Sequence, residues 1–144
     1  MKKTYVLDSY AILALLGRES GADEVSRLLH EGQESKSHLL MTWVNLGEVA
    51  YIVHRRWGQA KVYQIIAALE ATEIEIVSVG RELALAAAQI KAEYSLSYAD
   101  AFAAALTTLE TASLVTGDQE FKDLEGMISI HWLPFDGSPN RVYT

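Results

Sequence analysis

Three aspartates stand beside short apolar segments, where carboxylates can gather around a metal ion. Asp8 directly follows the run TYVL, Asp118 follows the run LVTG, and Asp100 stands early in a predicted helix. Carboxylate oxygens together with water bind hard cations such as Mg²⁺ and Mn²⁺. Because the chain has no cysteine, thiolate metal sites are excluded. This pattern indicates a site for a hard divalent cation if the carboxylates converge.

Each aspartate also has a simpler explanation as a helix cap. Asp8 and Asp118 can cap helices predicted at 9–17 and 119–124, with Gly117 allowing the chain to turn before the second helix. Asp100 lies three residues after Ser97, which is the S-x-x-D form of a capping box. Taken one at a time, these positions do not show whether each aspartate only caps a helix or also has a functional role.

Glu48 is a fourth candidate, on a long helix predicted at 42–57. It lies on the opposite side of this helix from an apolar stripe, so a solvated glutamate is the simpler interpretation. Four converging carboxylates would repel unless one holds a proton or a cation binds, and convergence would therefore favour a metal site. The stripe consists of Trp43, Leu46, Ala50, Val53 and Trp57, for which core or interface packing is expected.

Short apolar segments alternate with helical segments along the whole chain. Strands are predicted at 4–7, 38–41, 73–79, 113–116 and 127–133. Helices are predicted at 9–17, 22–32, 42–57, 59–71, 81–94, 97–111 and 119–124. This alternation predicts an α/β fold with a mainly parallel central sheet of about four to five strands flanked by helices. Ligands of such sheets lie at the carboxyl ends of the strands, where Asp8 and Asp118 are expected.

Length and composition restrict the class of protein. The chain has 144 residues, of which 50% are hydrophobic, so we expect a single domain over 1–133 and a loose tail over 134–144. Its net charge of −7 argues against nonspecific attraction to nucleic acid, although acids around a cation are neutralised by it. The apolar run at 10–16 is too short to span a bilayer. We therefore expect no membrane attachment and a cytoplasmic location.

Four segments, in this order, resemble PIN-domain ribonucleases, and in particular VapC-type toxins of bacterial type II toxin–antitoxin systems. They are YVLDSYAILALL (5–16), NLGEVAYIVHRRWG (45–58), LSYADAFAAAL (96–106) and LVTGDQEFKDLE (114–125). The likeness covers nearly the whole chain. It implies a three-layer PIN-like fold and hydrolysis of RNA phosphodiester bonds with Mg²⁺ or Mn²⁺ as cofactor.

The resemblance also implies roles for individual residues. Asp8, Glu48, Asp100 and Asp118 match the four acids that bind metal and carry catalysis in the family, and Asp8 and Asp100 match its principal metal ligands. The polar positions beside these acids, which orient ligands, water or backbone, are matched by Ser9, Asn45 and Thr116.

Partners are implied in the same way. Toxins of this class form homodimers, act on RNA and are held inactive by a cognate antitoxin protein. Arg55 and Arg56 near the end of the Glu48 helix complement the helix dipole, and they are also candidate contacts for the RNA backbone. The four histidines, at 30, 38, 54 and 131, have no ligand spacing, so structural or surface roles are expected.

Three other functions remain to be weighed. The chain can be a PIN nuclease of RNA processing, or a PIN module that binds RNA or protein without catalysis. The second of these predicts a missing acid, and none is missing. A phosphoreceiver-like signalling domain would need a pair of acids after the first strand, where only Asp8 stands.

Overall fold

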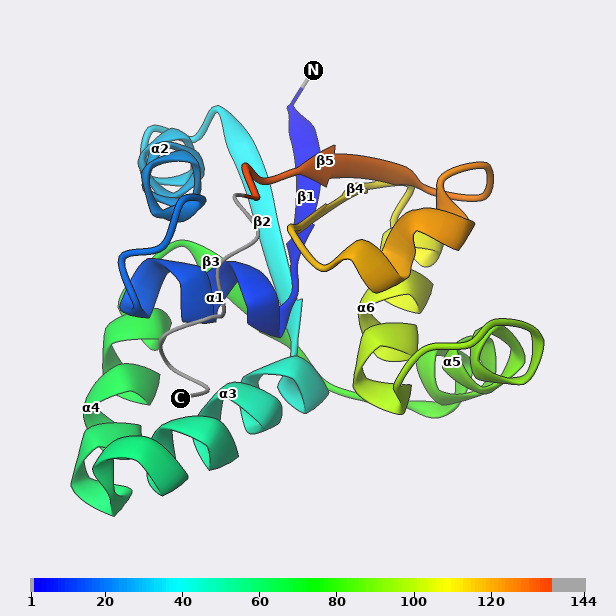
Figure 1. Ribbon diagram of the computed structural model, residues 1–144. Coiled ribbons are helices and arrows are strands. Elements are labelled where there is room, and N and C mark those ends of the chain that lie inside the picture. Colours follow the sequence, from blue (N-terminus) through cyan, green and yellow to red (C-terminus); the bar gives the residue numbers. More distant parts are fainter. Residues whose placement is uncertain (1, 136–144) are drawn as a thin grey trace.

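The computed structural model describes residues 2–135, which form a five-stranded parallel sheet flanked by helices (Figure 1). The strands lie in the order β3-β2-β1-β4-β5, and every neighbouring pair is parallel. This confirms the predicted α/β fold. The bounds are β1 Lys3–Leu7, β2 Ser37–Thr42, β3 Ile74–Val77, β4 Ser113–Thr116 and β5 Ser129–Trp132.

Seven helical segments connect the strands, and their number and order agree with the prediction. They are α1 Ser9–Leu16, α2 Ala22–Gln33, α3 Trp43–Trp57, α4 Gln59–Glu70, α5 Arg81–Glu93, α6 Tyr98–Leu109 and the 3₁₀ helix η1 Gln119–Leu124. The strands predicted at 73–79 and 127–133 are shorter than expected. Both are edge strands with one neighbour each, and β3 ends where its partner β2 ends, at the pair Thr42 and Val77.

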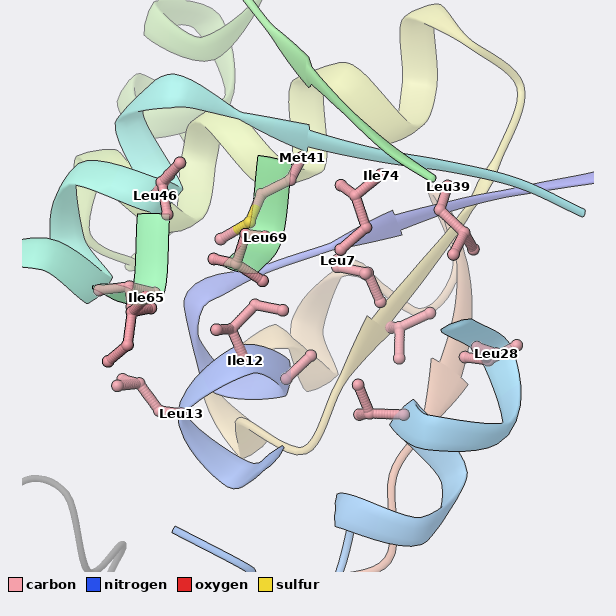
Figure 2. Close-up of a cluster of buried hydrophobic side chains, with 14 of the residues drawn as sticks. Leu7, Ile12, Leu13, Leu28, Leu39, Met41, Leu46, Ile65, Leu69 and Ile74 are labelled. Atoms are coloured by element: carbon pink, nitrogen blue, oxygen red, sulfur yellow. The ribbon is translucent and has the colours of Figure 1, made fainter. Parts of the chain in front are cut away.

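Helices cover both faces of the sheet, which gives three layers. Side chains alternate along β1: Tyr5 and Leu7 join one buried cluster, while Val6 joins the other. The first cluster packs α1 to α4 against one face, and Figure 2 shows ten of its side chains labelled, among them Ile12 and Met41. The second cluster packs α5, α6 and η1 against the opposite face. The sheet is therefore buried on both sides, as parallel sheets require.

Only part of the apolar stripe predicted on α3 lies in the core. Leu46 and Val53 are buried, but Trp43 and Trp57 are 39% and 44% exposed. These two tryptophans are the first and last residues of α3, so the ends of the helix place them outside the core. The face that is buried comprises Asn45, Leu46, Val49, Ile52 and Val53.

The strand order also separates this fold from a signalling receiver. Flavodoxin-like receiver domains have the order 2-1-3-4-5, whereas this sheet has the order 3-2-1-4-5.

Within residues 2–135 no helix is both long and apolar enough to cross a membrane. The predicted tail lies almost entirely outside the described residues, so the domain boundary at 133 stays a prediction.

Candidate metal and catalytic site

The four predicted acids converge on one pocket at the carboxyl edge of the sheet. The parallel pairing of Leu7 with Val115 places the residues that follow β1 and β4 side by side. Helices α3 and α6 begin near this edge and complete the site (Figure 1). The pocket has a volume of about 190 Å³ and is lined by Asp8, Ser9, Tyr10, Glu48, Ser97, Asp100, Asp118 and Glu120.

The capping explanations are also correct. Oδ1 of Asp8 accepts a hydrogen bond from the Ala11 amide at 2.9 Å, and Oδ1 of Asp118 accepts one from the Glu120 amide at 3.0 Å. The Ser97 hydroxyl accepts one from the Asp100 amide at 3.1 Å. A carboxylate has two oxygens, so one can cap a helix while the other faces a ligand. Capping fixes these side chains at the pocket and does not compete with function.

Glu48 is held in the pocket by the first residue of α1. The Ser9 hydroxyl donates a short hydrogen bond to the Glu48 carboxylate, which joins α1 to α3 directly beside Asp8. Ser9 is buried, whereas Glu48 is partly exposed. Ser9 therefore sets the orientation of the one acid that comes from the middle of a helix.

Asn45 lies behind the pocket and contacts backbone. Its side-chain amide donates a hydrogen bond to the Ala99 carbonyl at 3.0 Å, and its own backbone amide donates to the Thr42 hydroxyl at 3.0 Å. Asn45 is fully buried. It therefore fixes α3 against the start of α6, and so fixes Glu48 relative to Asp100.

Thr116 links the two strand-end aspartates. Its hydroxyl accepts a hydrogen bond from the Asp118 amide at 3.0 Å and donates one to the Asp8 carboxylate. The residue is fully buried, so water cannot replace these contacts. Thr116 therefore orients Asp8 and Asp118 together.

Burial and mutual repulsion disfavour ionisation of two of these acids. The pKa of Asp8 is raised well above its usual range, chiefly because the side chain is buried and further because Asp100 and Asp118 are close; the Thr116 and Ala11 hydrogen bonds oppose the rise. Burial, with the charges of Asp118 and Glu48, raises the pKa of Asp100 to about 7. A bound cation would remove this penalty, since it favours the ionised carboxylates.

Glu120 is a pocket residue that sequence reasoning missed. Asp100, Asp118 and Glu120 offer carboxylate oxygens that lie within 4.8 Å of one another, and Asp8 is outside this trio. Glu120 follows Asp118 by two residues in the first turn of η1, where it resembles an ordinary solvated acid. The only available signal was its proximity to an aspartate at a strand end.

Gly117 has a different role from the one predicted. Its φ is not in the left-handed region, which among the described glycines only Gly58 adopts. A Cβ at Gly117 would instead lie 2.4 Å from the Tyr10 ring, which lines the pocket. Glycine here allows the close approach of Tyr10, and a side chain would displace that ring; the turn itself does not call for glycine.

The pocket fits a small hard divalent cation. It offers only oxygen donors of high negative charge density, two of which are disfavoured as anions without a counter-charge. Water occupies about 30 Å³ per molecule in the liquid, so the pocket has room for a cation that keeps several waters. Mg²⁺ and Mn²⁺ have this preference, and softer metals do not.

Replacement of Thr116 by valine tests the linking role of its hydroxyl. Thr116→Val keeps the shape and removes both hydrogen bonds, so we expect any metal affinity or activity of the site to fall about 10- to 100-fold. The free energy of unfolding is expected to fall by about 1–3 kcal/mol, because the Asp118 amide and the Asp8 carboxylate lose a partner that water cannot replace. Divalent-ion titration and thermal melting of the same samples would separate these effects. Thr108→Val is the control, because the Thr108 hydroxyl bonds a helix carbonyl away from the pocket.

The fold and this pocket define a known class of protein. A family model of the PIN domain matches residues 5–127, so the chain belongs to the PIN-domain family. This confirms the family predicted from the four sequence segments. No curated protein sequence matches the chain significantly.

Solved structures of toxin–antitoxin proteins are similar in fold. The structure of VapBC2 from Rickettsia felis, bound to a fragment of promoter DNA, contains a chain that matches with a TM-score of 0.71 at 14% identity, over 91% of this chain and 99% of that one. VapBC from Salmonella typhimurium, also bound to DNA, matches with 0.69 at 18% identity, over 91% and 98%. VapC20 from Mycobacterium tuberculosis, a toxin that cleaves the sarcin–ricin loop, matches with 0.65 at 20% identity, over 83% and 93%. The fold is therefore that of VapC-type PIN proteins.

Proposed function

We propose that this protein is a metal-dependent endoribonuclease and the toxin of a toxin–antitoxin pair. The observation that carries the proposal is the convergence of Asp8, Glu48, Asp100 and Asp118 in one pocket of a PIN domain. Capping accounts for the position of two of these acids, but it does not account for Glu48, which caps nothing and still lies in the pocket. The similarity of fold to VapC-type toxins supports the toxin role.

Asp8 and Asp100 would hold the principal Mg²⁺ or Mn²⁺ ion, and Asp118, Glu48 and the newly identified Glu120 would complete its surroundings or help to hold a second ion. When bound, such an ion lowers the pKa of water and neutralises the phosphate oxygens. Asp118 and Glu120 lie within reach of Asp100, which supports a shared role for these three.

The chain's own groups would position and deprotonate the attacking water. Glu48, oriented by Ser9, is the best placed proton acceptor, because it is partly exposed and has no capping duty. The water oxygen forms a bond to phosphorus, the bond from phosphorus to the 3′ oxygen breaks, and that oxygen takes up a proton. The products are a 5′-phosphate and a 3′-hydroxyl. Asn45 and Thr116 contribute by holding the helices and acids in register.

The activity is tested by incubating a generic single-stranded RNA with the purified chain and Mn²⁺ or Mg²⁺. We expect internal cleavage that EDTA abolishes and that re-addition of the cation restores. Ligation-based end mapping should find 5′-phosphates at the new ends. Binding of RNA without cleavage under any divalent cation would favour a non-catalytic PIN module instead.

The toxin role needs a separate test, because a PIN nuclease of RNA processing has the same chemistry. We expect induction of the chain alone to arrest growth of its host and co-expression of a small neighbouring open reading frame to restore it. The two proteins should then purify as a complex. We further propose that the chain forms a homodimer, which light scattering of the purified protein would show. Cleavage without growth arrest would favour the RNA-processing alternative.

A further inference from the structure

One segment of this acidic chain has no acidic residue. Between Glu48 and Glu70 the sequence contains neither aspartate nor glutamate, but it contains Arg55, Arg56 and Lys61. The segment forms the last three fifths of α3 and nearly all of α4, two consecutive helices that pack together (Figure 1). This helical hairpin is therefore locally positive in a chain whose net charge is −7.

On this hairpin the Arg55 side chain packs against an aromatic ring. Its guanidinium carbon lies 5.1 Å from the centroid of the Tyr51 ring, which is a cation–π distance. The Tyr51 side chain is 49% exposed, and Arg55 is exposed as well. Within residues 2–135 no carboxylate forms an ion pair with Arg55. The guanidinium is thus not neutralised by an ion pair, and about half of Tyr51 is open to a ligand beside its contact with Arg55.

Tyr51 and Arg55 lie on the same side of α3 as Glu48. With 3.6 residues per turn, Arg55 is about 20° around the helix from Glu48 and about 10 Å further along it. Tyr51 lies between them along the axis and about 60° around the helix from Glu48. Glu48 lines the acidic pocket, so the pair forms a track that leads out of the pocket along α3. Arg56 is about 80° away from Glu48 by the same geometry and lies over Trp57 at 5.8 Å.

We propose that Tyr51 and Arg55 bind single-stranded RNA next to the cleaved phosphate, with Arg55 on a backbone phosphate and Tyr51 stacked on a base. This inference rests on the proposed ribonuclease function for the identity of the nucleic acid. A cationic group beside an aromatic ring is the combination that single strands require. The acidic pocket needs a bound cation, and the track that continues it is itself cationic. One RNA backbone passing over both would therefore meet positive charge in each place. The base must be unstacked to meet the ring, which excludes a regular duplex.

Binding to a labelled single-stranded oligouridylate, measured by fluorescence anisotropy over a range of KCl concentrations, tests this track. The measurement uses the Asp100→Asn chain with Mg²⁺, in which no cleavage is expected. We expect Arg55→Ala to weaken binding about tenfold and to reduce the slope of log K against log[salt] by about 0.7, because one phosphate contact is lost. Tyr51→Ala should weaken binding about tenfold without changing the slope, and Tyr51→Phe should bind normally.

Lys91→Ala is the charge-matched control, since Lys91 is exposed in the last turn of α5 and makes no ion pair within residues 2–135. Equal losses in Arg55→Ala, Arg56→Ala and Lys91→Ala would show a general charge effect and overturn the track. Unchanged RNA binding in Arg55→Ala and Tyr51→Ala would also overturn the track. This includes the case in which these variants no longer bind the antitoxin but still bind RNA normally. The wild-type chain can also bind RNA in a way that depends on Arg55 and Tyr51 and yet cleave no RNA. That result would support the track, while the ribonuclease proposal would fail. Unchanged thermal melting of each variant confirms that the fold is intact.

Discussion

Asp100→Asn is expected to abolish RNA cleavage and, at the same time, to stabilise the metal-free protein. Asp100, Asp118 and Glu120 offer carboxylate oxygens that lie within 4.8 Å of one another. Replacing Asp100 removes a proposed metal ligand, so cleavage should fall by at least about 10³-fold, which corresponds to roughly 4 kcal/mol of transition-state stabilisation. The asparagine carries no charge, so the repulsion from Asp118 and Glu48 that raises the pKa of Asp100 to about 7 disappears. Stability and activity therefore change in opposite directions.

Single-turnover cleavage and thermal melting at pH 8 in EDTA measure the two effects on the same preparation. Glu110→Gln is the matched control, because Glu110 caps the other end of α6 and is exposed there. It removes one negative charge from the same helix and is expected to leave both quantities unchanged. Loss of activity together with loss of stability would contradict the account, since it would show that Asp100 is needed for folding alone.

The metal-free protein is expected to lose stability as the pH rises from about 4 to about 7. Asp100 has an ordinary pKa of 3.8 when unfolded and a pKa of about 7 in the folded chain, so in this interval the folded state carries the extra proton. The free energy of unfolding then falls with pH by up to about 1.4 kcal/mol per unit, or about 4 kcal/mol in total. The raised pKa of Asp8 acts in the same direction. This is a large part of the 5–15 kcal/mol typical of a domain.

Urea denaturation in EDTA at several pH values gives this dependence directly. Mg²⁺ should reverse the loss, by about 2.7 kcal/mol at a concentration one hundred times its dissociation constant. In Asp100→Asn both the pH dependence and the effect of Mg²⁺ should be much smaller. A stability that rises from pH 5 to pH 8 without metal would show that these carboxylates are not held together as described.

The strand-end acids could be predicted from sequence because the rule behind them is simple. A parallel sheet brings the residues that follow its strands to one edge. An aspartate that follows an apolar run, as Asp8 and Asp118 do, can therefore be placed at that edge from the sequence alone. Asp100 was recognisable from the capping box with Ser97, and the bond of that box from the Asp100 amide to the Ser97 hydroxyl is formed as expected. Glu48 required the family resemblance, because its helical position alone favoured a solvated side chain.

Other parts of the site depend on tertiary packing and could not be predicted. The contact of Asn45 with the Ala99 carbonyl joins residues 54 positions apart, and nothing local marks it. The approach of Tyr10 to Gly117 is of the same kind, since it depends on how α1 packs beside β4. Trp43 and Trp57 were expected in the core or in an interface, and their exposure excludes only the core, because a helical stripe shows direction but not where the core ends. Sequence periodicity thus indicates which face of a helix or strand is buried, but it says much less about which residues that face contacts.

The central claim is that this acidic pocket performs metal-dependent cleavage of RNA, and one comparison tests it most directly. Wild-type and Asp8→Ala chains, purified identically, are incubated with the same RNA and Mn²⁺. Asp8 is buried at the carboxyl end of β1 and lines the pocket, so its loss should eliminate cleavage in a chain that still folds. The account predicts cleavage by the wild type alone, abolished by EDTA. Equal Mn²⁺-dependent cleavage by both chains would contradict it.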